Sequence, residues 1–176
     1  RRQGGFHDGL IHLLLSRISA GKTTLMRSLI SDCCKNHKVV YISTEETVEQ
    51  IEYSLGSEEM NKDNLEIVWE RGFLWDNPKI STEDYFYLLK IKAVKADILF
   101  FDNLTKTLKY IGSTPSGQNE FYESMAKAAH QLNIPFFIVA HVTPKKQMSS
   151  DFLSPDDIAY SKTPSRKAEY QFVLER

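Results

Sequence analysis

The sequence has only two cysteines among its 176 residues, and they are adjacent, at Cys33 and Cys34. Neighbouring residues of a helix point in different directions, so no disulfide bond is expected between them and an intracellular, reducing setting is the default. No apolar run approaches the roughly 18 residues that a membrane-spanning helix needs, and no signal peptide is visible. We therefore expect a cytoplasmic protein with no membrane partner.

The sequence also lacks an excess of either charge, because 22 basic side chains face 23 acidic ones and leave a net charge of −1. A uniformly basic surface is excluded, so any contact with nucleic acid must be local. With 41% hydrophobic residues, 8 glycines and 6 prolines, the composition excludes a disordered or collagen-like chain. The length fits a single domain, residues 1–176. Because the chain begins without methionine and stops at the end of an apolar run, we expect it to be part of a longer protein.

Short apolar runs alternate with amphipathic stretches along the chain. Continuous apolar runs are typical of strands buried on both faces, and strands that alternate with helices imply a parallel sheet. The predicted class is α/β, with a mainly parallel sheet flanked by helices. Strands are expected at 10–15, 39–43, 65–69, 98–101, 135–140 and 170–174, and helices at 22–35, 47–55, 82–94 and 118–132.

The first apolar run is followed by Ser16-Arg17-Ile18-Ser19-Ala20-Gly21-Lys22-Thr23-Thr24, which fits the phosphate-loop pattern except that Ser16 replaces its first glycine. Backbone amides and a helix N-terminus behind the loop would bind phosphate. Lys22 would reach the β- and γ-phosphates and Thr23 would bind Mg²⁺. The alternative is an ordinary helix start. The expected nucleotide contacts are Ser16, Arg17, Ser19, Ala20, Gly21, Lys22, Thr23 and Thr24.

The most apolar run ends in a carboxylate, Asp102, which is where a Mg²⁺-binding acid is expected beside a phosphate loop. The alternative is a plain turn, which Asp-Asn favours. The next residue is Asn103, whereas many ATPases place there the glutamate that orients the attacking water.

An acid for that purpose is available after the second predicted strand, at Glu45 and Glu46. A general base must lie within hydrogen-bond reach of the water, and Glu45 can do so if its strand lies next to the phosphate-loop strand. The alternative is that both glutamates cap the following helix, where negative charge is favourable.

In this order, the motifs resemble the RecA-fold hexameric replicative helicases, the superfamily that includes phage primase-helicases and DnaB-like proteins. The phosphate loop and the segment Val40–Gln50 match most specifically, and the latter places the family's catalytic glutamate at Glu45. Asp102 falls on the Mg²⁺-binding aspartate. His141, in Val139-Ala140-His141, is similar to the strand-end sensor of the γ-phosphate; a hydrogen-bonded rim residue is the alternative.

The resemblance implies a RecA-like phosphate-loop NTPase core that uses ATP and Mg²⁺, with catalytic roles for Lys22, Glu45 and His141. It further implies a ring-shaped homohexamer that translocates on single-stranded DNA, with primase and other replication proteins as possible partners in a bacterial or phage-infected cell. The family's arginine finger is expected on a strand beyond Arg176. Residues 109–119 and 142–157 would be loops that face the DNA channel, where Lys145 and Lys146 would contact phosphates.

Two other functions stay open. A non-motor RecA-like ATPase, such as a recombinase, a helicase loader or a regulatory scaffold, would bind ATP without unwinding DNA. A small-molecule kinase would need an arginine-rich lid over the phosphate donor, and the sequence contains no such cluster.

Overall fold

The computed structural model describes residues 5–56, 60–70, 81–111, 115–143, 152–154, 157 and 168–175. Six strands form its sheet: β1 (Ile11–Ser16), β2 (Val39–Ser43), β3 (Leu65–Trp69), β4 (Ile98–Asp102), β5 (Phe136–His141) and β6 (Tyr170–Leu174). The helices are α1 (Lys22–Cys34), α2 (Val48–Leu55), α4 (Thr82–Ala93), α5 (Leu104–Ile111) and α6 (Pro115–Leu132), with a 3₁₀ turn at Lys62–Asn64. None of the helices in these ranges is both long and apolar enough to cross a membrane.

The strands lie in the order β3-β2-β4-β5-β1-β6, and every pairing between them is parallel. The α/β class and the parallel sheet are thus confirmed. Parallel neighbours need crossover connections, and the amphipathic helices between the strands supply them. The carboxyl ends of β1, β2, β4 and β5 consequently lie at one edge of the sheet.

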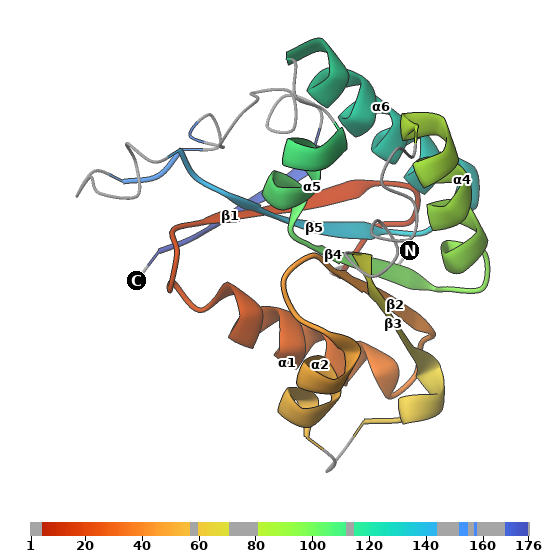
Figure 1. The fold of residues 1–176 in the computed structure, drawn as a ribbon. Helices are drawn as coiled ribbons and strands as arrows, with labels where there is room; N and C mark the ends of the chain where they lie inside the picture. The colour runs from red at the N-terminus through yellow and green to blue at the C-terminus, as the bar shows by residue number, and fades with distance from the viewer. Residues whose placement is uncertain are drawn as a thin grey trace.

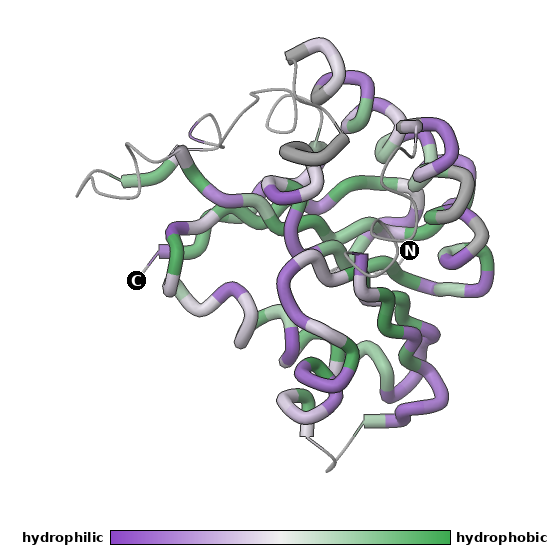
Figure 2. Tube along the Cα trace, viewed as in Figure 1, coloured by the Kyte–Doolittle hydropathy of each residue, from purple (hydrophilic) through white to green (hydrophobic). Residues whose placement is uncertain are grey.

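Helices cover both faces of the sheet, with α1 and α2 on one side and α4, α5 and α6 on the other (Figure 1). Alternate residues of each central strand point to opposite faces. On β4, for example, Leu99 and Phe101 belong to the core beneath α4 and α6, whereas Ile98 and Phe100 belong to the core beneath α1. Both faces are therefore apolar, which explains why the strands stand out as hydrophobic segments in Figure 2 and as unbroken apolar runs in the sequence.

Local capping explains where two of the helices begin. Thr47 accepts the backbone N–H of Gln50, and the Gln50 side chain accepts the backbone N–H of Thr47 in return, which forms a capping box at the start of α2. Ser81 accepts the N–H of Asp84 at the start of α4. The alternative that Glu45 and Glu46 cap α2 is wrong, because Thr47 takes that place.

Two sequence-based expectations about the arrangement are also wrong. The strand that precedes Glu45 does not lie beside the phosphate-loop strand, because β4 and β5 separate β2 from β1. The segment 109–119, expected as a loop, is largely helical: α5 continues to Ile111 and α6 begins at Pro115, a residue that the first turn of a helix tolerates. Residues 112–114 lie outside the described ranges.

The packing of α6 gives a first testable prediction. Phe121 is fully buried and its ring lies 5.4 Å from that of Tyr85 and 4.8 Å from that of Phe86 on α4. Phe121→Ala should lower the free energy of unfolding by about 3–5 kcal/mol, measured by urea denaturation, because it leaves a cavity between the two helices. The exposed Lys127→Ala on the same helix is the control and should change stability by less than about 0.5 kcal/mol. Equal effects of the two substitutions would contradict the packing.

Candidate active site

The turn between β1 and α1 is tight and adopts left-handed backbone angles at two residues, Ser19 (φ 62°) and Gly21 (φ 95°). A side chain at Gly21 would meet no neighbouring atom within 4 Å, so glycine is favoured there by the backbone angle rather than by lack of space. The loop closes on one oxygen: the Arg17 carbonyl accepts the Ser16 hydroxyl at 3.0 Å, the Lys22 ammonium at 3.1 Å and the Ala20 N–H at 3.4 Å.

The N-terminus of α1 differs from those of α2 and α4 in what offsets its partial positive charge. Gly21 has no side chain to cap α1, and the first turn contains no acidic residue. By contrast, α2 carries Glu49 and α4 carries Glu83 and Asp84 in their first turns, each behind a capping hydroxyl. The backbone amides and the dipole at the start of α1 are therefore arranged for an external anion.

Lys22 is only 7% exposed although it lies at the start of this helix. Burial lowers the pKa of its ammonium group, while the nearby carboxylates of Asp102 and Glu45 act in the opposite direction. Thr23, the next residue, is partly exposed, and Thr24 is exposed.

Asp102 ends β4 as a buried carboxylate, 6% exposed. The Tyr41 hydroxyl donates to its Oδ2 at 3.5 Å. Burial, followed by repulsion from Glu45, raises the pKa of Asp102 to about 6, and the charge of Lys22 only partly offsets these two effects. A cation beside this carboxylate would remove most of that cost.

Glu45 lies just beyond β2, and its Oε1 receives contacts from three groups. These are the Asn103 amide nitrogen at 2.8 Å, the Lys106 ammonium at 3.0 Å and the His141 Nε2 at 3.6 Å. His141 and Lys106 stabilise the ionised form and lower the pKa of Glu45 to about 2, although partial burial opposes them.

Asn103 connects the other members of this group. It is fully buried, its N–H donates to the Thr44 hydroxyl at 3.0 Å, and its Oδ1 accepts the N–H of Lys106 at 2.9 Å. Because Oδ1 is used in this way, the amide nitrogen faces Glu45 and also His141, whose Nε2 lies 3.1 Å away. A neutral His141 must accept this N–H at Nε2 and therefore carries its proton on Nδ1.

The structure thus brings four predicted residues to one edge of the sheet, from the ends of different strands: Lys22 after β1, Glu45 after β2, Asp102 on β4 and His141 on β5. The pairing of Ser43 with Asp102 and of Ser16 with His141 sets their heights. The predicted residues Lys145 and Lys146 lie outside the described ranges.

Sequence reasoning missed the residues that hold this group together, which are Thr44, Asn103, Thr105 and Lys106. Asn103 drew attention only because it is not a glutamate, and its spacing to Lys106 as a cap for α5 was the available signal. Thr105, whose hydroxyl accepts the N–H of His141 at 2.9 Å, and Lys106 carry no motif that would have identified them.

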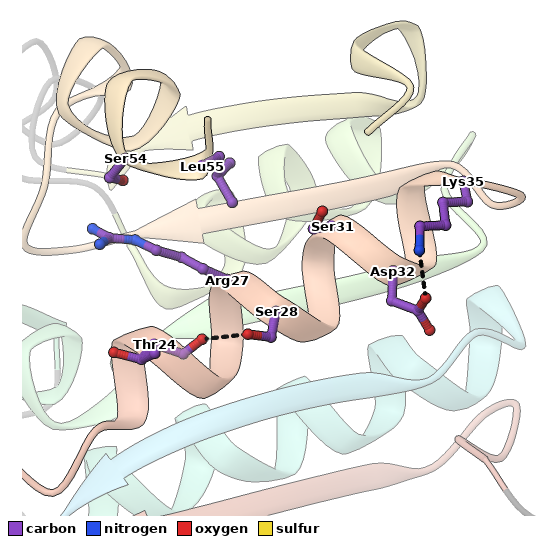
Figure 3. A pocket seen from close by; sticks show the side chains of 8 residues that line it. All are labelled: Thr24, Arg27, Ser28, Ser31, Asp32, Lys35, Ser54 and Leu55. Atoms are coloured by element: carbon purple, nitrogen blue, oxygen red, sulfur yellow. Dashed lines mark hydrogen bonds and ion pairs between the residues drawn. The ribbon is translucent and has the colours of Figure 1, made fainter. Parts of the chain in front are cut away.

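Two clefts lie away from this group. One, of about 490 Å³, runs along the outer face of α1 beside α2 (Figure 3); among the predicted site residues only Thr24 lines it, together with polar side chains such as Arg27 and Ser54. The other, of about 620 Å³, lies at the opposite edge of the sheet, where Asp97 and Pro135 precede β4 and β5. Neither has the convergence of charge seen around Glu45 and Asp102.

Comparison with solved structures identifies the architecture. The chain superposes on the ATPase domain of a phage DnaB-like helicase with a TM-score of 0.72, covering 98% of this chain and 71% of that one at 15% identity. This is the RecA-like fold. No protein-family model matches the chain, and no curated protein matches its sequence. The RecA-like fold predicted from the motifs is thereby confirmed, and the similarity extends over nearly the whole chain.

The buried acid of this RecA-like domain gives a second prediction, made without nucleotide or divalent ions. Because the pKa of Asp102 is raised on folding, the folded chain keeps a proton that the unfolded chain loses, and stability falls as pH rises from about 4 to about 6. Asp102→Asn should therefore increase the free energy of unfolding by about 2 kcal/mol at pH 8, and the gain should shrink towards pH 4. Denaturation at several pH values in EDTA measures this.

The matched control is Asp32→Asn, at a side chain that is 79% exposed. It should stay within about 0.5 kcal/mol of the native protein at pH 8. A loss of stability in Asp102→Asn at pH 8 would show that the ionised carboxylate is not the burden inferred here.

Proposed function

We propose that this chain is the ATP-hydrolysing motor domain of a hexameric replicative DNA helicase. The observation that carries the proposal is the meeting of Lys22, Asp102, Glu45 and His141 at the carboxyl edge of a parallel sheet, which is where open α/β sheets bind ligands. The likeness in fold to a helicase ATPase domain supports the same interpretation.

The residues present fit a nucleotide triphosphate. The uncapped N-terminus of α1 offers backbone amides to phosphate, and Gly21 leaves the approach to them open. Lys22 is held by the Arg17 carbonyl, and exchanging this contact for phosphate oxygens would replace a neutral acceptor by a charged one. Ser16, Arg17, Ser19, Ala20, Thr23 and Thr24 are the remaining proposed contacts.

The residues also fit a magnesium ion held largely by the nucleotide. Within the described ranges no group of three or more His, Cys, Asp or Glu side chains is placed to bind a metal. Mg²⁺ is commonly bound by one or two protein oxygens together with phosphates and waters, and Asp102 and the hydroxyl of Thr23 offer such oxygens. When bound, the ion would neutralise charge that develops on the phosphates.

The catalytic proposal follows from the ionisation states. Glu45 is a carboxylate at all pH values at which the protein would work, so it can accept a hydrogen bond from the attacking water and orient it. His141 lies next to both Glu45 and the end of β1, where it would sense the γ-phosphate. Lys22 would stabilise the charge on the transferred group.

The finer parts of the proposal concern DNA and assembly. A ring of six copies would place Lys145 and Lys146 around a central channel, which gives a nearly neutral chain a locally positive surface for single-stranded DNA. Primase and other replication proteins are the proposed partners of the assembled ring. An arginine finger from a neighbouring subunit would complete each site.

Nucleotide binding provides the direct test of the proposed site. Lys22→Ala should weaken binding of a fluorescent ATP analogue in the presence of Mg²⁺ by at least about tenfold, because the ammonium group is the principal positive charge beside the loop. Fluorescence anisotropy measures the affinity. Lys35→Ala, at the other end of α1, is the control and should bind like the native chain. Equal affinities of native protein and Lys22→Ala would remove the basis of the proposal.

DNA dependence separates a motor from the two other functions. Hydrolysis of ATP should be stimulated by single-stranded oligo(dT), and replacing both Lys145 and Lys146 by alanine should reduce the stimulation and its salt sensitivity while leaving nucleotide affinity unchanged. Steady-state phosphate release at two salt concentrations measures both. Hydrolysis that ignores DNA would favour a non-motor ATPase, and transfer of phosphate to a nucleoside or sugar would favour a kinase.

A further inference from the structure

The carboxylate proposed to orient water is held by groups outside its own strand. Glu45 is a loop residue with a side chain that is 39% exposed, and its backbone N–H contacts the Ser43 hydroxyl at 3.3 Å. The side chain itself is fixed by Asn103, Lys106 and His141, all of which reach the same oxygen, Oε1. The position of Glu45 therefore depends on the start of α5 and the end of β5.

Two of these three groups are rigid. Asn103 is fully buried and both ends of its amide are occupied, by Lys106 and Thr44 on the backbone side and by Glu45 and His141 at Nδ2. The backbone of His141 is tied to α5 through the Thr105 hydroxyl, at 2.9 Å. These contacts provide a fixed frame for the carboxylate.

Lys106 is the third group, and it differs from the other two. Its side chain is long, one-third exposed, and extends from the first turn of α5 to Glu45. It contributes a full positive charge to an oxygen that already accepts the Asn103 amide. A carboxylate oxygen that is occupied in this way is a poorer acceptor for a water molecule, because the same lone pairs serve the ammonium group.

We propose that Lys106 is a positioning residue that restrains Glu45, and that displacement of the first turn of α5 frees this carboxylate for hydrolysis. The inference rests on the proposed ATPase function. It gives α5, the segment that directly follows the metal-binding strand β4, a direct effect on the water-orienting group. The low pKa of Glu45 agrees with the restraint, since Lys106 is one of the two groups that lower it.

The first test compares turnover in variants of Lys106. Lys106→Met keeps the length of the side chain but removes the charge, so it should raise kcat for ATP without DNA by about two- to fivefold, the range expected for a partly exposed ion pair. KM and the affinity for the fluorescent analogue should not change. Lys106→Arg keeps the charge and should restore native turnover, which a merely structural role would not predict.

A matched control exists on α4. Lys92 forms an ion pair of comparable length with Glu66, at 2.8 Å, remote from the site. Lys92→Met should leave kcat unchanged. In a Glu45→Gln background, Lys106→Met should have no effect on the residual rate, because the group that it restrains is gone.

A second readout needs no nucleotide. The charged groups around Glu45 are His141 on β5, Lys106 on α5, Lys22 on α1 and Asp102 on β4. In Lys106→Met, the titration midpoint of the Glu45 carboxyl carbon, followed by NMR, should move upward from its native position. An unchanged midpoint would overturn the restraint.

The outcomes distinguish this inference from the proposed function. If the native protein binds no ATP, or if Lys22→Ala binds as well as the native protein, the proposed function fails. If hydrolysis requires Glu45 but Lys106→Met is as slow as the native protein or slower, the function stands and the restraint is wrong.

Discussion

Parallel pairing is the constraint on which the candidate site depends. Side chains that follow β1, β2, β4 and β5 meet only because these strands run in the same direction and end at the same edge. The register then sets the depth at which each side chain lies, with Ser43 opposite Asp102 and Ser16 opposite His141. Apolar residues on both faces of the sheet hold this arrangement against two layers of helices. The chemistry at the edge thus rests on packing some distance from it.

The electrostatics of the edge are unbalanced in an informative way. Two acids, Glu45 and Asp102, lie close enough to influence each other, but the pKa of one is lowered and that of the other is raised. Glu45 has positive and hydrogen-bonding neighbours and is partly exposed, whereas Asp102 is buried and has little beyond Lys22 and a tyrosine hydroxyl. One environment favours a permanent carboxylate and the other favours a bound cation, so the two acids are suited to different tasks.

Much of this could be predicted from the sequence because it depends on local pattern. Strand bounds such as Val39–Ser43 and Leu65–Trp69 follow from apolar runs, and Lys22, Glu45 and Asp102 follow from positions at the ends of those runs. Strand order could not be predicted in this way, because it depends on crossovers between distant segments, and β2 proved not to be next to β1. The helical course of α5 was missed since its pattern is short, and Lys106 was missed because its partner lies 61 positions away in the sequence.

The double use of the Asn103 amide limits how this protein can evolve. An amide has one end that donates and one that accepts, and here the accepting end begins α5 while the donating end holds Glu45. An acidic residue has only accepting oxygens, so placing one at 103 would set two negative groups against each other and leave the imidazole without its donor. A lineage that moved its water-orienting acid to this neighbouring position would have to rebuild the junction between β4 and α5 at the same time. The location of that acid on β2 is thus an inherited commitment of the surrounding polar network and is not exchangeable by a single substitution.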